Sequence, residues 1–211
     1  FNVLKEYIKS SKKIRFEGDG YGEAWRLEAE KRGLSNIADT PRALDAYANP
    51  EFVKLFQITE VMSHVEVEAR HEIMLDEYFM KIQIESRVLG DIAGNHIIPT
   101  AIRYQNLLIE NVQRLKDILD KATFDKVAKE QLEMIKMISN RISKILSDKE
   151  SMIQARRDAN KIADARSRAI AYCDTVKPFF DTIRYEVDKL EMVIDDEYWP
   201  LPKFREMLFT R

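Results

Sequence analysis

The chain is poor in cysteine, histidine, glycine and proline, and these shortages exclude several classes of protein. Its 211 residues include one cysteine, three histidines, six glycines and six prolines. The single Cys173 cannot form an internal disulfide and is typical of a reducing compartment. Sparse glycine and proline, together with 33% charged residues, suit a soluble and mostly helical protein.

Long hydrophobic runs and an excess of positive charge are also missing. No stretch approaches the ~20 apolar residues that a membrane-spanning helix needs, and the first residues do not resemble a signal peptide. A net charge of −2 argues against general nucleic-acid binding, which needs a basic face. We therefore expect a cytoplasmic protein whose partners are neither membranes nor nucleic acids. Because the chain begins at Phe1 rather than Met, we also expect a piece of a longer polypeptide.

Apolar residues recur at helical spacing along most of the chain, which predicts an all-α fold. We expect helices over residues 2–13, 21–32, 51–89, 100–121 and 124–147, and a short helix between Thr40-Pro41 and Asn49-Pro50. A further stripe from Met152 to Val176 predicts one helix that Pro178 ends, and a stripe from Phe180 to Ile194 predicts the last helix. Short turns between long helices favour an elongated antiparallel bundle.

The predicted core faces follow these stripes. In the helix over 51–89 the stripe comprises Phe52, Leu55, Phe56, Met62, Val65, Ala69, Ile73, Met80 and Ile84. In the last helix it comprises Phe180, Ile183, Val187, Leu190 and Ile194. Arg166 interrupts the stripe over 152–176, so we expect it at an end of the bundle or paired with a carboxylate.

Two regions are expected along the chain. Residues 1–50 would hold short helices and a glycine-rich turn, and residues 51–211 would form the long-helix bundle. The aromatic and proline-rich tail around Trp199-Pro-Leu-Pro202 should fold back and dock on the bundle. If both tryptophans are buried, changing Trp25 or Trp199 to alanine would cost about 3–5 kcal/mol.

The most specific segment is Phe16–Leu34, which holds four of the six glycines. Gly18-Asp-Gly-Tyr-Gly22 approaches the G-x-G-x-x-G of a dinucleotide site, but Glu23 stands where the third glycine would fall. Asp19 and Glu23 would repel a phosphate, and no G-K-[ST] follows. We interpret the segment as a structural turn before the helix that holds Trp25, rather than as a phosphate loop.

A possible metal site involves His64, Glu68 and His71, which share one helix face. Glu68-Ala-Arg-His71 has the E-x-x-H spacing of di-iron bundles, but the second copy that such sites need is missing. The three residues could also hold a zinc ion, although the fourth ligand is absent. We favour solvated surface histidines and predict no metal-binding residues, with a di-iron bundle as an alternative that metal analysis would test.

Catalytic and anion-binding patterns are weak as well. Cys173 lies on an apolar stripe, where a buried and inert thiol is expected, and no G-x-S-x-G occurs. Five clustered cations could grip an anion: Arg156, Arg157, Lys161, Arg166 and Arg168. The interspersed Asp158 and Asp164 instead indicate a solvated helix face. We predict no catalytic or cofactor-binding residues in this chain.

Several segments together resemble the C-terminal region of type III glutamine synthetases. The first is Ile14-Arg-Phe-Glu-Gly-Asp-Gly-Tyr-Gly-Glu-Ala-Trp25, followed by Arg32-Gly-Leu34. Arg70-His-Glu72, Ile97-Ile-Pro99 and the tail with Trp199-Pro-Leu-Pro202 agree in order. Glu17, Asp19 and Gly22 depart from the usual residues of the turn, so no specific contact is carried over there. The resemblance spans nearly all of the chain, although residues 123–176 match only as generic helices.

The resemblance implies a parent enzyme that joins ammonia to glutamate with ATP and magnesium or manganese. It places the ATP, metal and glutamate sites in a catalytic barrel upstream of Phe1, so these residues alone should be inactive. It implies double hexameric rings, with the chain's own catalytic domain and neighbouring subunits as partners. We interpret the chain as a helical segment that supports this assembly; the alternative is a stand-alone helical scaffold that binds protein partners.

Overall fold

The computed structural model describes residues 1–209, and none of these residues is in a strand. The predicted all-α fold is therefore confirmed. The chain divides into two compact units, Phe1–Ala43 and a second unit that begins at Leu44. Among the residues described, no helix has both the length and the apolar character that a bilayer crossing requires.

The first unit consists of short helices separated by turns. They are α1 (Asn2–Ser10), a 3₁₀ segment (Ser11–Ile14), α2 (Glu23–Lys31) and α3 (Thr40–Ala43). Gly33 follows α2 with a φ of +69°, a left-handed conformation that glycine adopts without strain. The N–H of Leu34 then donates to the carbonyl of Ala29 across 2.9 Å. Gly33 thus ends α2 as its sequence position predicts.

The predicted helix over 51–89 is interrupted in the second unit. It consists of α4 (Pro50–Ile58) and α5 (His64–Asp91), and Glu60 between them has a φ of +55°. Ser63 starts α5 with a capping box, in which its hydroxyl accepts from the N–H of Glu66 and the Glu66 carboxylate accepts from its N–H. The S-x-x-E signal at 63–66 was missed because the apolar spacing continues across the turn.

Replacing Ser63 with alanine should lower the free energy of unfolding by about 1 kcal/mol, because the start of α5 loses its cap. The backbone N–H and hydroxyl of Ser63 hold the pKa of Glu66 below its ordinary value of 4.5. This stabilisation is complete above that value and is lost as the pH falls through the lowered pKa. Urea unfolding at pH 7 measures the loss, and Ser143→Ala on the exposed surface of a later helix is the control. Equal effects of the two substitutions would contradict the capping role.

Two π-helical segments carry the long helices past prolines. α5 continues through Ile92–Ile97 into α6 (Ile98–Ile118), so Pro99 falls in the first turn of α6. α9 (Ala165–Ala171) continues in the same way through Tyr172–Val176 into α10 (Pro178–Glu191). The prediction that Pro178 ends the helix was wrong. The wider π turn before it places Pro178 in the first turn of α10, where the missing backbone N–H of proline breaks no helical hydrogen bond.

The remaining boundaries also differ from the prediction. α7 (Lys121–Val127) begins directly after Asp120, so the turn precedes the expected residues 121–123. α8 (Lys129–Ala159) crosses the expected break after 147 and ends where the next predicted helix should continue. Asp164 then caps α9 by accepting from the N–H of Ser167 across 2.7 Å. Aspartates at Ncap positions set these starts, and apolar spacing does not reveal them.

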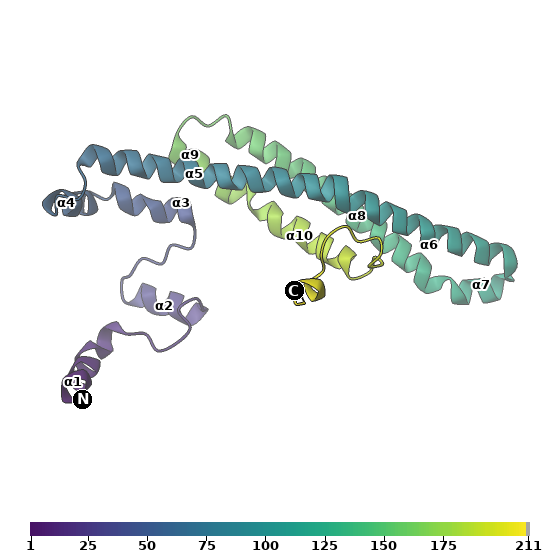
Figure 1. Ribbon diagram of the computed structural model, residues 1–211, viewed down its shortest axis with the longest axis horizontal. Helices are drawn as coiled ribbons and strands as arrows, with labels where there is room; N and C mark the ends of the chain where they lie inside the picture. Colours follow the sequence, from purple (N-terminus) through teal and green to yellow (C-terminus); the bar gives the residue numbers. More distant parts are fainter. Residues whose placement is uncertain (210–211) are drawn as a thin grey trace. The chain divides into compact units, whose positions relative to one another are not determined.

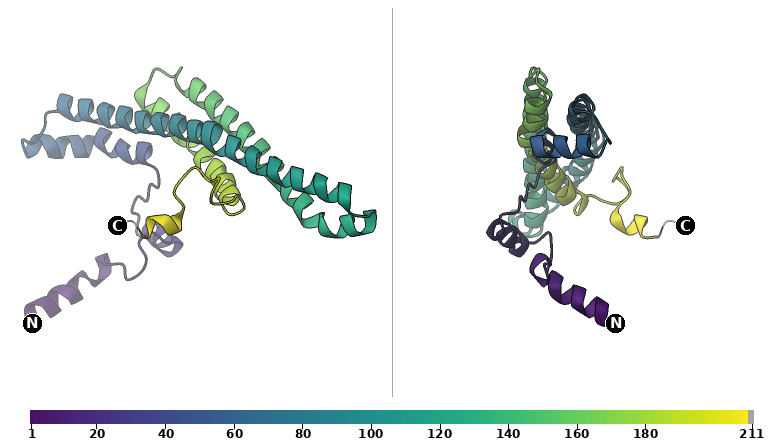
Figure 2. Two further views of the ribbon diagram at one scale, coloured as in Figure 1. Left: turned by 45° about the vertical axis from the view of Figure 1, so that its right-hand side comes forward. Right: turned by 90° about the vertical axis from the view of Figure 1, so that its left-hand side faces the viewer.

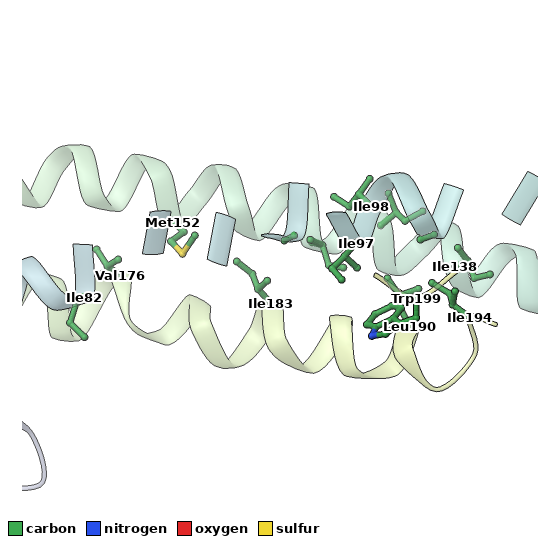
Figure 3. Close-up of a cluster of buried hydrophobic side chains, with 14 of the residues drawn as sticks. Ile82, Ile97, Ile98, Ile138, Met152, Val176, Ile183, Leu190, Ile194 and Trp199 are labelled. Atoms are coloured by element: carbon green, nitrogen blue, oxygen red, sulfur yellow. The ribbon is translucent and has the colours of Figure 1, made fainter. Parts of the chain in front are cut away.

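The long helices of the second unit form the predicted antiparallel bundle. α5 and α6 run in one direction, α8 returns beside them, and α10 follows the first direction again (Figure 1). Figure 2 shows α6 and α8 side by side in further views. The packed core between them contains Ile97, Ile138, Ile145, Met152, Ile183 and Leu190, several of which are labelled in Figure 3. The predicted stripe of the last helix faces this core.

Candidate functional site

The predicted histidine face lies on the first turns of α5. His64 Nδ1 is 3.4 Å from Glu68 Oε2, and both side chains are more than half exposed. His71 is partly buried, and its Nε2 has no hydrogen-bond partner. The interpretation as a solvated histidine therefore fits His64 but is wrong for His71, whose side chain is partly buried. Throughout residues 1–209, no three acidic, histidine or cysteine side chains are grouped so as to hold a metal ion.

Cys173 is only partly buried, so its predicted place in the core was wrong. The neighbouring Tyr172 lies in the core instead, three residues after the buried Ala169. The Tyr172 hydroxyl donates to Asn160 Oδ1 across 2.7 Å and accepts from Gln83 Nε2 across 3.0 Å. Burial raises the pKa of Tyr172 above its ordinary value of 10.0, so the phenol stays protonated and keeps this network intact.

The five predicted cations do not converge on one point. Lys161 pairs with Asp158, and Arg168 lies over the Phe79 ring with its guanidinium carbon 4.2 Å from the centroid. Both Arg166 Nε and one of its terminal nitrogens donate to the Asp45 carboxylate across 2.6 Å. The expected carboxylate partner of Arg166 therefore exists. Arg156 contacts α5 at a different place from Arg168, because it donates to Ser86 Oγ across 3.3 Å.

The predicted apolar stripe of α5 is exposed rather than buried. Val65, Ile73 and Ile84 are 71%, 57% and 60% exposed. The buried side of the helix carries Val67, Leu75, Ile82 and Ser86. The prediction was wrong because α5 has apolar residues on two sides, and periodicity does not say which side packs within the chain. We call the exposed set Val65, Ile73, Met80, Ile84 and Val88 the outer face of α5.

The first unit also has apolar side chains without a covering partner. Helix α1 presents Val3, Leu4, Tyr7 and Ile8, each more than half exposed. Full burial within residues 1–43 is limited to Ala29 and Pro41. A unit of this size with so few buried side chains lacks a core that could stabilise it. Its apolar face is of the kind that another polypeptide surface covers.

These features define a helical domain that has more apolar surface than its own core buries. Residues 1–116 match the family described as glutamine synthetase C-terminal domain. The chain belongs to this family. The resemblance to type III glutamine synthetases that its glycine-rich turn and tail indicate is thereby confirmed.

Three curated relatives align along nearly the whole chain. It is 46% identical over 211 residues to a glutamine synthetase of Bacteroides fragilis, and 26% identical over 209 residues to the type-3 glutamine synthetase of Dictyostelium discoideum. It is 28% identical over 208 residues to a glutamine synthetase of Butyrivibrio fibrisolvens. These alignments cover 99–100% of the chain but only 28–29% of the length of the relatives.

Proposed function

We propose that this chain is the helical domain that packs on the catalytic part of a glutamine synthetase and supports its assembly. The observation that carries the proposal is the uncovered apolar outer face of α5 in a member of this family. The curated relatives have about 70% of their length outside the aligned region, and that length offers the partner. The face of α1 with Tyr7 and Ile8 is a second contact of the same kind.

The energetic argument rests on the hydrophobic effect. Covering an exposed isoleucine contributes about 1.5–3 kcal/mol, so a stripe of five apolar residues can stabilise an interface strongly. Exposed polar side chains such as Lys81 border the outer face of α5, and the exposed Glu77 lies within it, one turn after Ile73. An apolar centre with a polar rim is the usual anatomy of a protein interface.

The whole enzyme would ligate ammonia to glutamate with ATP and magnesium or manganese, as double hexameric rings in the cytoplasm. Within the described part of this chain, no cluster of side chains fits a divalent ion. In the family that the sequence resembles, the reaction sites lie in the catalytic barrel, so we propose no step of the reaction for these residues. Their contribution would be to hold the catalytic part and the neighbouring subunits in place.

The test places charge on the outer face of α5 in the full-length enzyme. Ile73→Asp combined with Ile84→Asp removes two apolar contacts. The equilibrium constant for assembly should therefore fall at least about 100-fold. Size-exclusion chromatography with light scattering measures the assembly. The 211-residue chain with the same changes should keep its helical circular dichroism, because both side chains are exposed there.

The matched control is Lys126→Gln combined with Lys136→Gln, which changes the net charge equally at exposed positions of α7 and α8. It should leave assembly unchanged. An enzyme that assembles and melts normally with both aspartates on α5 would contradict the proposal.

A further inference from the structure

A hollow of about 230 Å³ lies between α5 and α8, at the start of the first π-helical segment. Three cationic side chains line it: Arg87 from α5, and Lys149 and Arg156 from α8. In Figure 1 these two helices lie side by side at this level. The hollow therefore collects positive charge from two segments that are distant in the sequence.

The charge in the hollow is not neutralised by the protein. Within residues 1–209, Arg87, Lys149 and Arg156 form no ion pair. One carboxylate, Asp91, also lines the hollow, but its oxygen accepts a hydrogen bond from the Asn95 side chain. Three cations thus face a single anion, which leaves an excess of positive charge in the hollow.

Gly94 lets Lys149 lie across the helix that forms the floor, whereas a side chain at Gly90 would make only an ordinary contact with it. A Cβ on Gly94 would lie 2.2 Å from Lys149 Nζ, and a Cβ on Gly90 would lie 3.9 Å from Lys149 Cε. Glycine disfavours helix formation, so its presence at a close approach has a packing reason. The absence of a side chain at 94 leaves room for the amine of Lys149 in its present position.

Arg156 is positioned by a buried hydroxyl. Its guanidinium donates to Ser86 Oγ, and the Ser86 hydroxyl in turn donates to the carbonyl of Gln83 across 2.8 Å. Ser86 is only 1% exposed. Burial, and next the positive charge of Arg87, lower the pKa of Arg156. Positive charges held this close repel one another, and a bound anion offsets this repulsion.

We propose that the hollow binds a small phosphate-type oxyanion, with Arg87, Lys149 and Arg156 as its ligands. Each planar guanidinium group can donate two parallel hydrogen bonds to two phosphate oxygens, and the lysine ammonium adds a positive charge. The volume is below the roughly 300–1,000 Å³ typical of sites for drug-sized ligands, which favours a free anion. The site goes beyond the role in assembly and does not depend on it.

The test is calorimetric titration of the 211-residue chain with inorganic phosphate, at an ionic strength held constant with sodium chloride. Wild type should show saturable binding at one site. Arg156→Gln should weaken the affinity at least 10-fold. Arg157→Gln makes the same change of charge one residue away on the exposed surface and should leave the affinity within 2-fold of wild type.

A second variant tests the geometry without changing the charge. Gly94→Ala should move the Lys149 amine away from the hollow and weaken phosphate binding several-fold, while alanine keeps the segment helical. Circular dichroism checks that the helices remain. Absence of saturable binding by wild type, or equal losses in Arg156→Gln and Arg157→Gln, would overturn the proposal. Unchanged affinity in Lys149→Gln would remove Lys149 as a ligand.

Discussion

Replacing Trp199 with alanine should lower the free energy of unfolding of the chain by about 3–5 kcal/mol. The indole is only 8% exposed and lies beside Leu190 in the core (Figure 3). Lys203 fastens the same tail, because its Nζ donates to the carbonyl of Glu191 across 3.0 Å and its ammonium lies 5.9 Å from the indole centroid. Removing the indole leaves a cavity and detaches the tail from the end of α10.

Urea unfolding followed by far-ultraviolet circular dichroism measures this loss, and Trp25→Ala is the comparison. Trp25 is partly buried, and its ring packs 5.0 Å from the Phe16 ring within the first unit. The sequence predicts equal losses if both indoles are buried, whereas the structure predicts a clearly smaller loss for Trp25. A loss below about 1 kcal/mol for Trp199 would mean that the tail is not docked.

Replacing Ile183 with alanine should cost about 2–5 kcal/mol, the range for a fully buried aliphatic side chain. Ile183 is completely buried on α10, where it faces α8. The cost exceeds that of the lost methylene groups, because a packed core relaxes only partly around a cavity.

The control for Ile183 is Ile84→Ala, the same substitution on the outer face of α5. Its side chain is exposed, so the change should stay within about 0.5 kcal/mol. Denaturant unfolding of the two variants gives the comparison directly. If both substitutions cost the same in the 211-residue chain, the assignment of the buried and outer faces would be wrong.

The sequence predicts the class of fold and the core of α10 well. The helix that carries the stripe from Phe180 to Ile194 has one apolar side, so its periodicity identifies the buried face. α5 has two apolar sides, and choosing between them needs the positions of α8 and α10. The helix breaks near Glu60 and Asn160 were missed because apolar spacing continues through both turns.

The basic hollow was not predictable from local patterns. Sequence reasoning grouped Arg156 with its neighbours along the helix, and most of those cations engage other partners. Its companions Arg87 and Lys149 are brought to it by packing between α5 and α8. The glycine at 94 was a usable signal, since a glycine inside a helix often marks a close approach.

The π-helical segments at Ile92–Ile97 and Tyr172–Val176 also change the way in which this chain must be aligned with others. Successive residues of an α-helix are about 100° apart around its axis, and a π turn accommodates one additional residue. Deleting one residue there would convert the wide turn into an ordinary α turn, so Ile183 should keep facing α8, whereas a deletion within α10 before Ile183 would rotate that side chain by about 100°. Single-residue gaps are therefore tolerated at these two places, whereas a single-residue gap within a regular part of α5, α6 or α10 would alter the packing of the bundle.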